Sequence, residues 1–184
     1  MFRDRNRAIG NTRHVTPRLR HVDPTRPRGR VSRTYATMST TRVGRLLSEK
    51  IVWKLDPYLL RATRGRVGMS LVIATNVLET RGAKTDAVRR NALIYFHDGV
   101  RVTIIASKAG AANHPAWYHN LLANPDVLFG GIEMTATVVT DPIDQARLWA
   151  LADRVFAPYA TYRQEAAVAG RTIPLVQLTK RRPI

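Results

Sequence analysis

Short runs of β-branched and apolar residues recur through the second half of the chain and predict strands. Two pairs of runs predict hairpins, because Asp98-Gly99 and Gly130-Gly131 are dipeptides that tight turns between antiparallel strands favour. The expected strands occupy residues 70–75, 77–80, 91–107 as a first hairpin, 127–139 as a second hairpin, and 173–179.

Two helices are expected between these strands. A short helix is predicted over residues 115–123, with Asn113 as its N-cap. A longer helix should begin at Asp141-Pro142, an N-cap followed by proline at the first helical position, and continue to about Phe156. Antiparallel strands interrupted by helices predict a mainly β fold, a small barrel with helical insertions.

A basic amphipathic segment precedes the strands, at residues 42–66. Val43, Leu47 and Ile51 share helical spacing, Trp53 lies near the same stripe, and arginines and lysines surround it. Such a segment either packs its apolar stripe on its own domain or lies on an anionic membrane surface, and both interpretations stay open. No run in the sequence approaches the roughly 18 apolar residues that would span a bilayer.

The net charge of +17 is unevenly distributed. Ten arginines stand against two acids in residues 1–37, so this fifth of the chain holds nearly half of the excess. This part of the chain is rich in Arg, Pro and Thr and has no apolar periodicity. We therefore expect residues 1–42 to be a basic disordered extension that precedes a domain at 43–184. The extension could instead precede a start at Met38, or be a transit peptide or an RNA-binding arm. Aromatic stacking platforms do not interleave its arginines, so we expect no nucleic-acid partner.

Several kinds of site find no support in the sequence. The chain has no cysteine, which excludes disulfides and thiolate metal sites and fits a reducing cytoplasm. His97, His114 and His119 are not paired at helical ligand spacing, so we expect no metal site. The glycine patterns of serine hydrolases and Rossmann cofactor sites do not occur either.

Two polar segments carry candidate binding chemistry. Residues 79–95, "ETRGAKTDAVRRNALIY", join two strands through a loop whose cations can hold an anion, at about 1.5–3 kcal/mol for each charge-assisted bond. In residues 104–111, "IIASKAGA", Lys108 leaves a strand for a loop of small residues whose N–H groups can face a ligand. Each loop alone is also compatible with a solvated basic turn. The candidate anion ligands in the first loop are Arg81, Lys84, Thr85, Arg89 and Arg90.

Taken with "PAWYHNL" at residues 115–121, these motifs resemble the deazaflavin-dependent nitroreductase and quinone reductase family of actinobacteria, whose members use coenzyme F420. The family pattern runs Thr-x-Gly-Arg-Lys-Ser/Thr-Gly, Ser-Lys-Gly-Gly, Pro-x-Trp-Tyr-x-Asn-Leu and Ala-Asn-Pro. This chain has "TRGAKTD" from Thr80, "SKAG" from Ser107 and "ANP" from Ala123 at the matching places. The resemblance extends over about residues 46–180.

The resemblance implies a split β-barrel related to FMN-binding barrels, with F420 in a groove beside the sheet. By position, Lys84, Thr85 and Arg89 would hold the phosphate and acidic tail of the coenzyme, and Tyr159 and Tyr162 would lie near the acceptor as catalytic residues. The residues implied to line the ring, the ribityl chain and the same groove are Asn91, Ser107, Lys108, Ala109, Gly110, Trp117 and Asn120.

The chain departs from the family pattern at the proposed anion site. Ala83 replaces an arginine, Asp86 replaces a glycine, and Ala109 also replaces a glycine. Arg81 or Arg90 could supply the charge that Ala83 lacks.

The implied reaction is hydride transfer from reduced F420 to an electron-poor small molecule such as a quinone, a nitroaromatic or an activated alkene, without a metal. Alternatives are a non-catalytic deazaflavin carrier and an FMN-binding or haem-binding barrel. The expected place is the cytoplasm, with peripheral contact at the inner face of the cell membrane if the segment 42–66 binds lipid.

Overall fold

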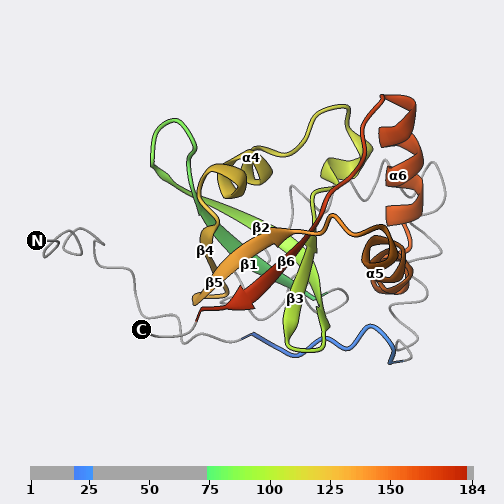
Figure 1. The fold of residues 1–184 in the computed structure, drawn as a ribbon, viewed down its shortest axis with the longest axis horizontal. Helices are drawn as coiled ribbons and strands as arrows, with labels where there is room; N and C mark the ends of the chain where they lie inside the picture. Colours follow the sequence, from blue (N-terminus) through green and yellow to red (C-terminus); the bar gives the residue numbers. More distant parts are fainter. Residues whose placement is uncertain (1–18, 27–73, 182–184) are drawn as a thin grey trace, which may run out of the picture.

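The computed structural model describes residues 19–26 and 74–181 (Figure 1). Its strands close into one antiparallel barrel in the order β1-β2-β3-β6-β5-β4. This confirms the predicted barrel with helical insertions. The strands are β1 (Thr75–Arg81), β2 (Val88–Asp98), β3 (Arg101–Ile105), β4 (Asp126–Phe129), β5 (Ile132–Val138) and β6 (Leu175–Lys180). The helices are the 3-10 turn η3 (Lys108–Gly110), α4 (Ala116–Ala123), α5 (Pro142–Val155) and α6 (Tyr159–Val168).

Both predicted hairpins are confirmed. β2 and β3 pair around Gly99, which has a φ of 59°, and β4 and β5 pair around Gly130 and Gly131, with φ of 59° and 79°. These left-handed conformations cost little for glycine, and this explains why glycine marked the turns in the sequence.

The first strand differs from the prediction of two strands at 70–75 and 77–80. Thr75–Arg81 is one strand, paired along its whole length with β2, and residues 70–73 lie outside the described part of the chain. Asn76, between the two predicted strands, lies within β1, where its side chain accepts a bond from the N–H of Val77. β2 also begins at Val88, ahead of the predicted start at residue 91.

The helices confirm one predicted cap and correct another. Asp141 accepts the N–H of Asp144 at 2.8 Å, and Pro142 opens α5, as the sequence predicted. Asn113 does not cap α4, because the residue before the first turn is Pro115 and the helix has no side-chain cap bond. Helix α6 was not predicted, and its first turn has neither a capping side-chain bond nor an acidic residue.

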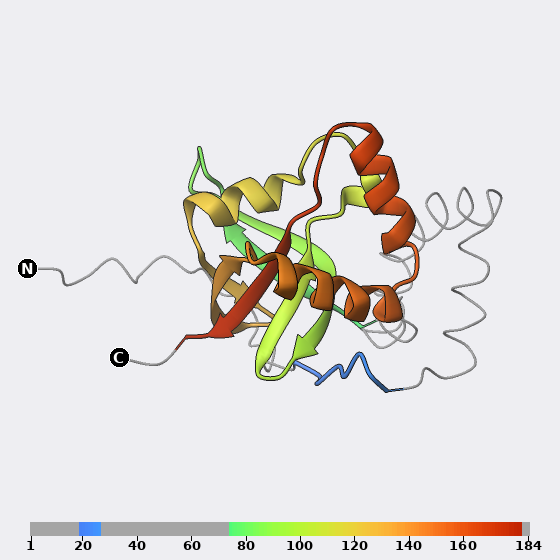
Figure 2. The same cartoon turned by 45° about the vertical axis from the view of Figure 1, so that its right-hand side comes forward.

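The apolar side chains form two clusters. One fills the barrel and includes Leu78, Ile104, Phe129 and Leu178, each fully buried. The other lies between the barrel wall and the helices α5 and α6, which cover one side of the sheet (Figure 2). The barrel therefore presents a helix-covered wall and two ends.

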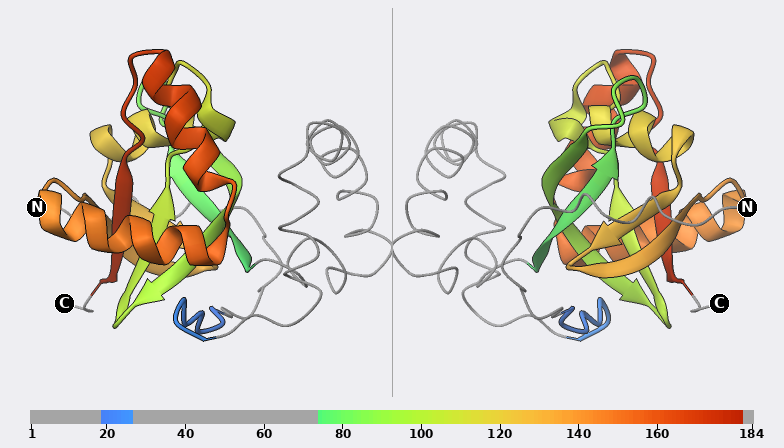
Figure 3. Two further views of the ribbon diagram at one scale, coloured as in Figure 1. Left: turned by 90° about the vertical axis from the view of Figure 1, so that its right-hand side faces the viewer. Right: turned by 90° about the vertical axis from the view of Figure 1, so that its left-hand side faces the viewer.

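Residues 19–26 contact the barrel, although they lie within the predicted extension 1–42 (Figure 3). Val22 accepts the N–H of His97 at 2.8 Å and donates its own N–H to Nδ1 of His97 at 3.0 Å. Tyr95 donates its hydroxyl to the carbonyl of Arg20 at 2.9 Å. These contacts hold residues 19–26 along the edge of β2.

The remaining residues of the predicted extension lie outside the described residues, as does the amphipathic segment 42–66. Its membrane contact therefore stays a prediction. Within the described ranges, the helices are too short or too polar to cross a bilayer.

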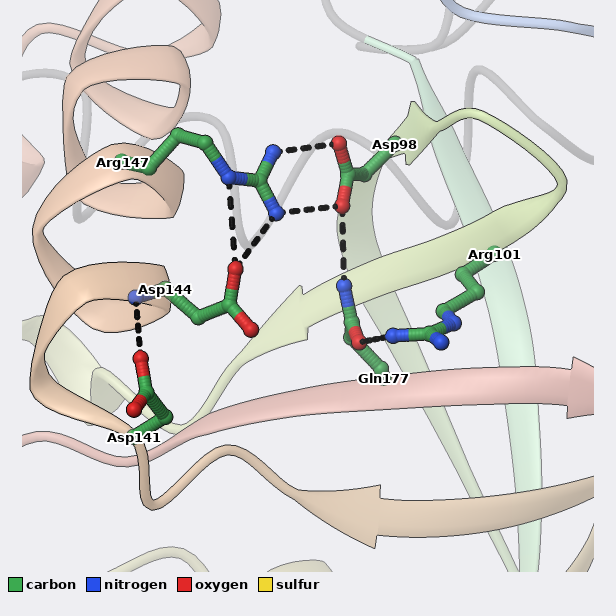
Figure 4. Close-up of polar contacts among 6 residues, drawn as sticks. All are labelled: Asp98, Arg101, Asp141, Asp144, Arg147 and Gln177. Carbon is green, nitrogen blue, oxygen red and sulfur yellow. Dashed lines mark hydrogen bonds and ion pairs between the residues drawn. The ribbon is translucent and has the colours of Figure 1, made fainter.

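We call the end of the barrel that holds the β2–β3 turn the hairpin end, and an ionic network ties α5 to it (Figure 4). Arg147 donates to both carboxylate oxygens of Asp98, at 2.6 and 2.9 Å, and also to Asp144 at 2.9 Å. Gln177 donates to the same Asp98 carboxylate at 3.1 Å and accepts from Arg101 at 2.9 Å. The bonds from Arg147 hold the pKa of Asp98 below its ordinary value.

Candidate functional site

The other end of the barrel opens where β2 leaves β3. β2 pairs with β3 only from Tyr95 to Asp98, whereas its first half, residues 88–94, pairs with β1 alone. Since antiparallel neighbours run in opposite directions, the β1–β2 loop at residues 82–87 and the segment 106–110 after β3 lie at this same end. We call it the loop end.

The β1–β2 loop presents the predicted cations to solvent. Gly82 closes the turn, since its carbonyl accepts the N–H of Asp86 at 2.8 Å and its N–H donates to Ala87 at 2.9 Å. Lys84 and Thr85 in this loop, and Arg89 at the start of β2, are exposed. These three predicted ligands of an anionic tail therefore lie together.

The two arginines that could supply the charge missing at Ala83 already form ion pairs. Arg81 lies 3.2 Å from Asp86, and Arg90 lies 3.0 Å from Glu79. Both pairs are solvent-exposed and so contribute little to stability, but each carboxylate offsets the positive charge beside it. The unpaired cations of this region, among the described residues, are Lys84 and Arg89.

Asn120 holds the β1–β2 loop on α4. Its Oδ1 accepts the N–H of Ala83 at 3.1 Å, and its Nδ2 donates to Thr80 Oγ1 at 3.1 Å. The side chain is buried, so both polar groups are used inside the protein. Arg89 lies opposite Thr80 in the β1–β2 register, on the same face as Asn91. Asn120 therefore anchors the β1–β2 loop to α4, a role in addition to the coenzyme binding predicted from the sequence.

The segment after β3 makes a tight turn with an unusual backbone. Lys108 and Ala109 have φ of 45° and 49°, a left-handed conformation that costs a residue with Cβ about 1 kcal/mol or more. Ser107 before them is right-handed. Both Lys108 and Ala109 are exposed. The sequence departs from glycine at Ala109 even though glycine would suit this backbone better.

Gly110 and Trp117 serve the packing of this end. Gly110 is buried under α6, where a Cβ would come within 2.8 Å of the Glu165 side chain and 3.1 Å of the Tyr162 carbonyl. Trp117 is 5% exposed and belongs to the cluster that fills the barrel. The glycine therefore allows α6 to approach η3.

The two predicted catalytic tyrosines have different environments. Tyr159 is 3% exposed and packs against Trp149 and Phe156, and this burial raises the pKa of its hydroxyl. Tyr162 is half-buried on α6, and its carbonyl lies against Gly110 of η3. Burial therefore favours a packing role for Tyr159, whereas Tyr162 lies nearer to the loop end.

Sequence reasoning missed Arg171, which lies just before β6. This side chain is 6% exposed, and its Nη1 and Nη2 donate to the carbonyls of Ala106 at 3.0 Å and Ser107 at 2.7 Å. Nη1 also lies 3.4 Å from Nδ1 of His114. Burial lowers the pKa of Arg171. Burial, together with the positive charge of nearby Arg171, also lowers the pKa of His114. An isolated arginine in "GRTIP" gave no motif that could have identified it.

A shallow depression of about 500 Å³ adjoins Arg171. None of the predicted coenzyme residues lines it, so its position does not support it as the coenzyme site. In the part of the chain that the structure describes, no group of His, Asp and Glu side chains could hold a metal. The depression is lined by Ala112, Asn113, His114, His119, Gly170, Arg171 and Thr172.

Comparison with known proteins identifies the family. Residues 54–180 match the F420H(2)-dependent quinone reductase family. The chain belongs to this family. It is 38% identical over 137 residues to an F420H(2)-dependent quinone reductase of Mycobacterium tuberculosis strain H37Rv, a match that covers 70% of this chain and 89% of the relative. The resemblance deduced from the sequence is thereby confirmed.

Solved structures are also similar to this chain. One, described as a domain-swapped dimer, has a TM-score of 0.50 and 29% identity, covering 56% of this chain and 78% of the other. A second, an F420-H2 dependent reductase, has a TM-score of 0.49 and 29% identity, covering 56% of this chain and 92% of the other.

The protein is therefore an F420-dependent oxidoreductase built on a closed antiparallel β-barrel, and F420 is its coenzyme. Hydride transfer from reduced F420 to an electron-poor acceptor is the activity that this family implies, as predicted. A non-catalytic carrier and an FMN or haem barrel are not supported.

Proposed function

We propose that this chain reduces a quinone, using F420 bound at the loop end of the barrel. The observation that carries the proposal is the donor set at this end: unpaired cations at Lys84 and Arg89, together with a turn at residues 107–109 in which Lys108 and Ala109 are exposed. An anionic coenzyme with several acceptor oxygens fits such donors.

In this assignment Lys84, Thr85 and Arg89 bind the phosphate and acidic tail of F420. Ser107, Lys108 and Ala109 bind the ring and ribityl chain, with Asn91 on the neighbouring strand. Trp117 and Asn120 support the same end from α4. When bound and reduced, the deazaflavin supplies a hydride, while the protein provides orientation and excludes water.

The acceptor must also gain a proton after hydride transfer. We propose Tyr162 for this step, because it is half-buried beside η3, whereas Tyr159 is enclosed in the core. Tyr162→Phe should lower the turnover number with the affinity for F420 unchanged. Tyr159→Phe is the matched control and should affect stability alone. Equal turnover in the wild type and Tyr162→Phe would remove Tyr162 from the mechanism.

The test of the proposed function offers the purified protein reduced F420, reduced FMN and NADPH in separate anaerobic assays, with menadione as the acceptor. Protein-dependent oxidation, above the rate measured without protein, is expected for reduced F420 alone. Protein-dependent menadione reduction by reduced FMN but not by reduced F420 would overturn the proposal. Replacing menadione with a nitroaromatic compound at equal concentration then ranks the two acceptor classes by kcat/KM.

A further inference from the structure

We propose that Arg171 is a positioning residue for the coenzyme. It holds the turn at residues 107–109 so that the backbone N–H groups of the turn point at an acceptor oxygen of bound F420. This inference rests on the proposed function and adds a residue outside every motif of the sequence. Arg171 follows α6 in the chain, and the turn that it holds follows β3.

The guanidinium grips two successive carbonyl groups. Its Nη1 donates to Ala106 at 3.0 Å and its Nη2 donates to Ser107 at 2.7 Å. Two parallel donors in one rigid plane suit such a pair, and a lysine ammonium could not reproduce this fork. The buried position of Arg171 keeps water from competing for either carbonyl.

Holding these carbonyls also fixes the direction of two N–H groups. Each peptide unit is planar and trans, so its N–H points opposite to its C=O. The Ala106 carbonyl shares a peptide unit with the Ser107 N–H, and the Ser107 carbonyl shares one with the Lys108 N–H. Because both carbonyls face Arg171, the N–H groups of Ser107 and Lys108 face away from it.

The backbone of the turn brings a third N–H group into the same set. Ser107 is right-handed, with φ of −69° and ψ of −44°, and Lys108 follows with a φ of 45°. A right-handed residue followed by a left-handed one forms a concave nest of N–H groups that binds anions. Across residues 19–26 and 74–181, no acceptor takes the N–H of Ser107, Lys108 or Ala109.

Arg171 adds positive charge behind this nest. No carboxylate of the described residues pairs with its guanidinium, whose acceptors are the two carbonyls and Nδ1 of the neighbouring His114. The Glu165 carboxylate does lie beside Gly110, at the end of the turn. The guanidinium charge reinforces the partial positive charge of the N–H groups. An electron-rich oxygen is the group that this arrangement favours.

F420 offers two sources of such an oxygen, its ring and ribityl portion and its phosphate-bearing tail. A comparison of intact F420 with the deazaflavin riboside that lacks the tail separates them. Weaker binding of both ligands in an Arg171 variant indicates that the nest faces the ring and ribityl portion. Weaker binding of F420 alone indicates the tail.

The experiment measures the dissociation constants of F420 and the riboside by fluorescence titration of the full chain. Arg171→Met removes the fork and the charge, and Arg171→Lys keeps the charge with a single donor centre. Arg147→Met is the matched control, an arginine removed from the hairpin end. All titrations are made well below the melting temperature of the least stable variant.

We expect Arg171→Met to weaken F420 binding at least tenfold and to shift the absorption band of the bound deazaflavin, because donors at its oxygens change. Arg171→Lys should recover part of the affinity, and Arg147→Met should leave affinity and spectrum unchanged. Wild-type affinity and spectrum in a folded Arg171→Met would overturn the inference. If that variant does not fold, wild-type affinity and spectrum in Arg171→Lys would overturn it equally.

The two proposals fail in different ways. If the wild-type protein does not bind F420, the assignment of the coenzyme to the loop end fails. If the wild type binds F420 and substitution of Lys84 weakens it, but Arg171→Met does not, only the role of Arg171 is wrong.

Discussion

Two arginines at opposite ends of the barrel are held in opposite ways. Arg147 at the hairpin end has a side chain that is 46% exposed and pairs with the carboxylates of Asp98 and Asp144. Arg171 at the loop end is 6% exposed and bonds to carbonyls instead. Accordingly, carboxylates raise the pKa of Arg147, and burial lowers the pKa of Arg171.

The difference lies in charge balance. At the hairpin end Arg147 is paired with two carboxylates, so its positive charge is offset within the network that joins α5 to the barrel. At the loop end Arg171 keeps its charge, and the described residues provide no ion-pair partner for Lys84, Arg89 or Lys108. Uncompensated charge is a cost for folding and an advantage for binding an anion. The comparison therefore separates a stabilising end from the end that we propose binds F420.

The largest effect is expected from the exposed cations of the loop end. Lys84→Ala combined with Arg89→Ala should weaken F420 binding at least about tenfold, and toward a hundredfold if each cation contributes about 1.5 kcal/mol. The melting temperature should change little, because both side chains are exposed. Fluorescence titration at two salt concentrations measures this, since screening should reduce the difference between wild type and variant.

The control for this pair is Arg81→Ala combined with Arg90→Ala. These arginines lie in the same segment, but carboxylates already offset their charges. Their loss should therefore have a smaller effect on F420 affinity. Equal losses in the two double variants would mean that total charge, rather than unpaired charge, determines binding.

Asn120, the uncharged side chain that anchors the β1–β2 loop, should matter for stability as well as for binding. Asn120→Leu removes both bonds of the buried amide and leaves the Ala83 N–H and Thr80 hydroxyl without their partner, at a cost of about 2 kcal/mol. Urea unfolding measures this loss, and His119→Leu on the exposed side of α4 is the control. F420 affinity should also fall, because the loop that carries Lys84 is released.

Sequence could predict much of this architecture. Asp98-Gly99 and Gly130-Gly131 marked the hairpins because their glycines have a left-handed backbone, and Asp141-Pro142 marked the start of α5 through a local bond. Where the deciding interaction is long-range, the prediction from sequence was wrong or absent. Thr75–Arg81 is continuous because β2 pairs along all of it, and α6 forms although no side chain caps it.

The same division applies to the candidate site. Lys84, Arg89 and Lys108 were predictable because charged side chains in polar loops are visible in a sequence. Arg171 was not, because its partners are the carbonyls of Ala106 and Ser107, and any residue in their place carries the same carbonyls. A side chain that binds only backbone groups places no constraint on the residue types of its partners, so no sequence motif reveals it.

At the hairpin end, Arg147→Met should lower the free energy of unfolding by about 1 kcal/mol, because its bonds to Asp98 are bidentate but partly exposed. F420 affinity should stay unchanged. Urea unfolding and fluorescence titration on the same preparation measure both. If this variant bound F420 as weakly as Arg171→Met, the separation of a stabilising end from a binding end would be wrong.

The smallest expected effect is a difference between the two ends in acid. The pKa of Asp98 is lowered from 3.8 in the folded state, so the stability that it contributes is present above that value and is lost as the pH falls through the lowered pKa. The pKa of His114 is lowered from 6.5, so its contribution is present above 6.5 and is lost as the pH falls below it, when a proton on Nδ1 would repel Arg171.

His114→Gln should therefore flatten the dependence of unfolding free energy on pH between about 7 and 5, whereas Arg147→Met should alter it only near pH 4 and below. The His114 effect should be smaller than the roughly 1 kcal/mol expected for Arg147→Met, because the His114 imidazole is half-buried. Burial also lowers the pKa of His97, so this histidine contributes to the pH dependence as well, and the quantity to compare is wild type minus His114→Gln at each pH. Identical profiles for wild type and His114→Gln would show that His114 stays uncoupled from Arg171, and the acid response would then belong to the hairpin end and to His97.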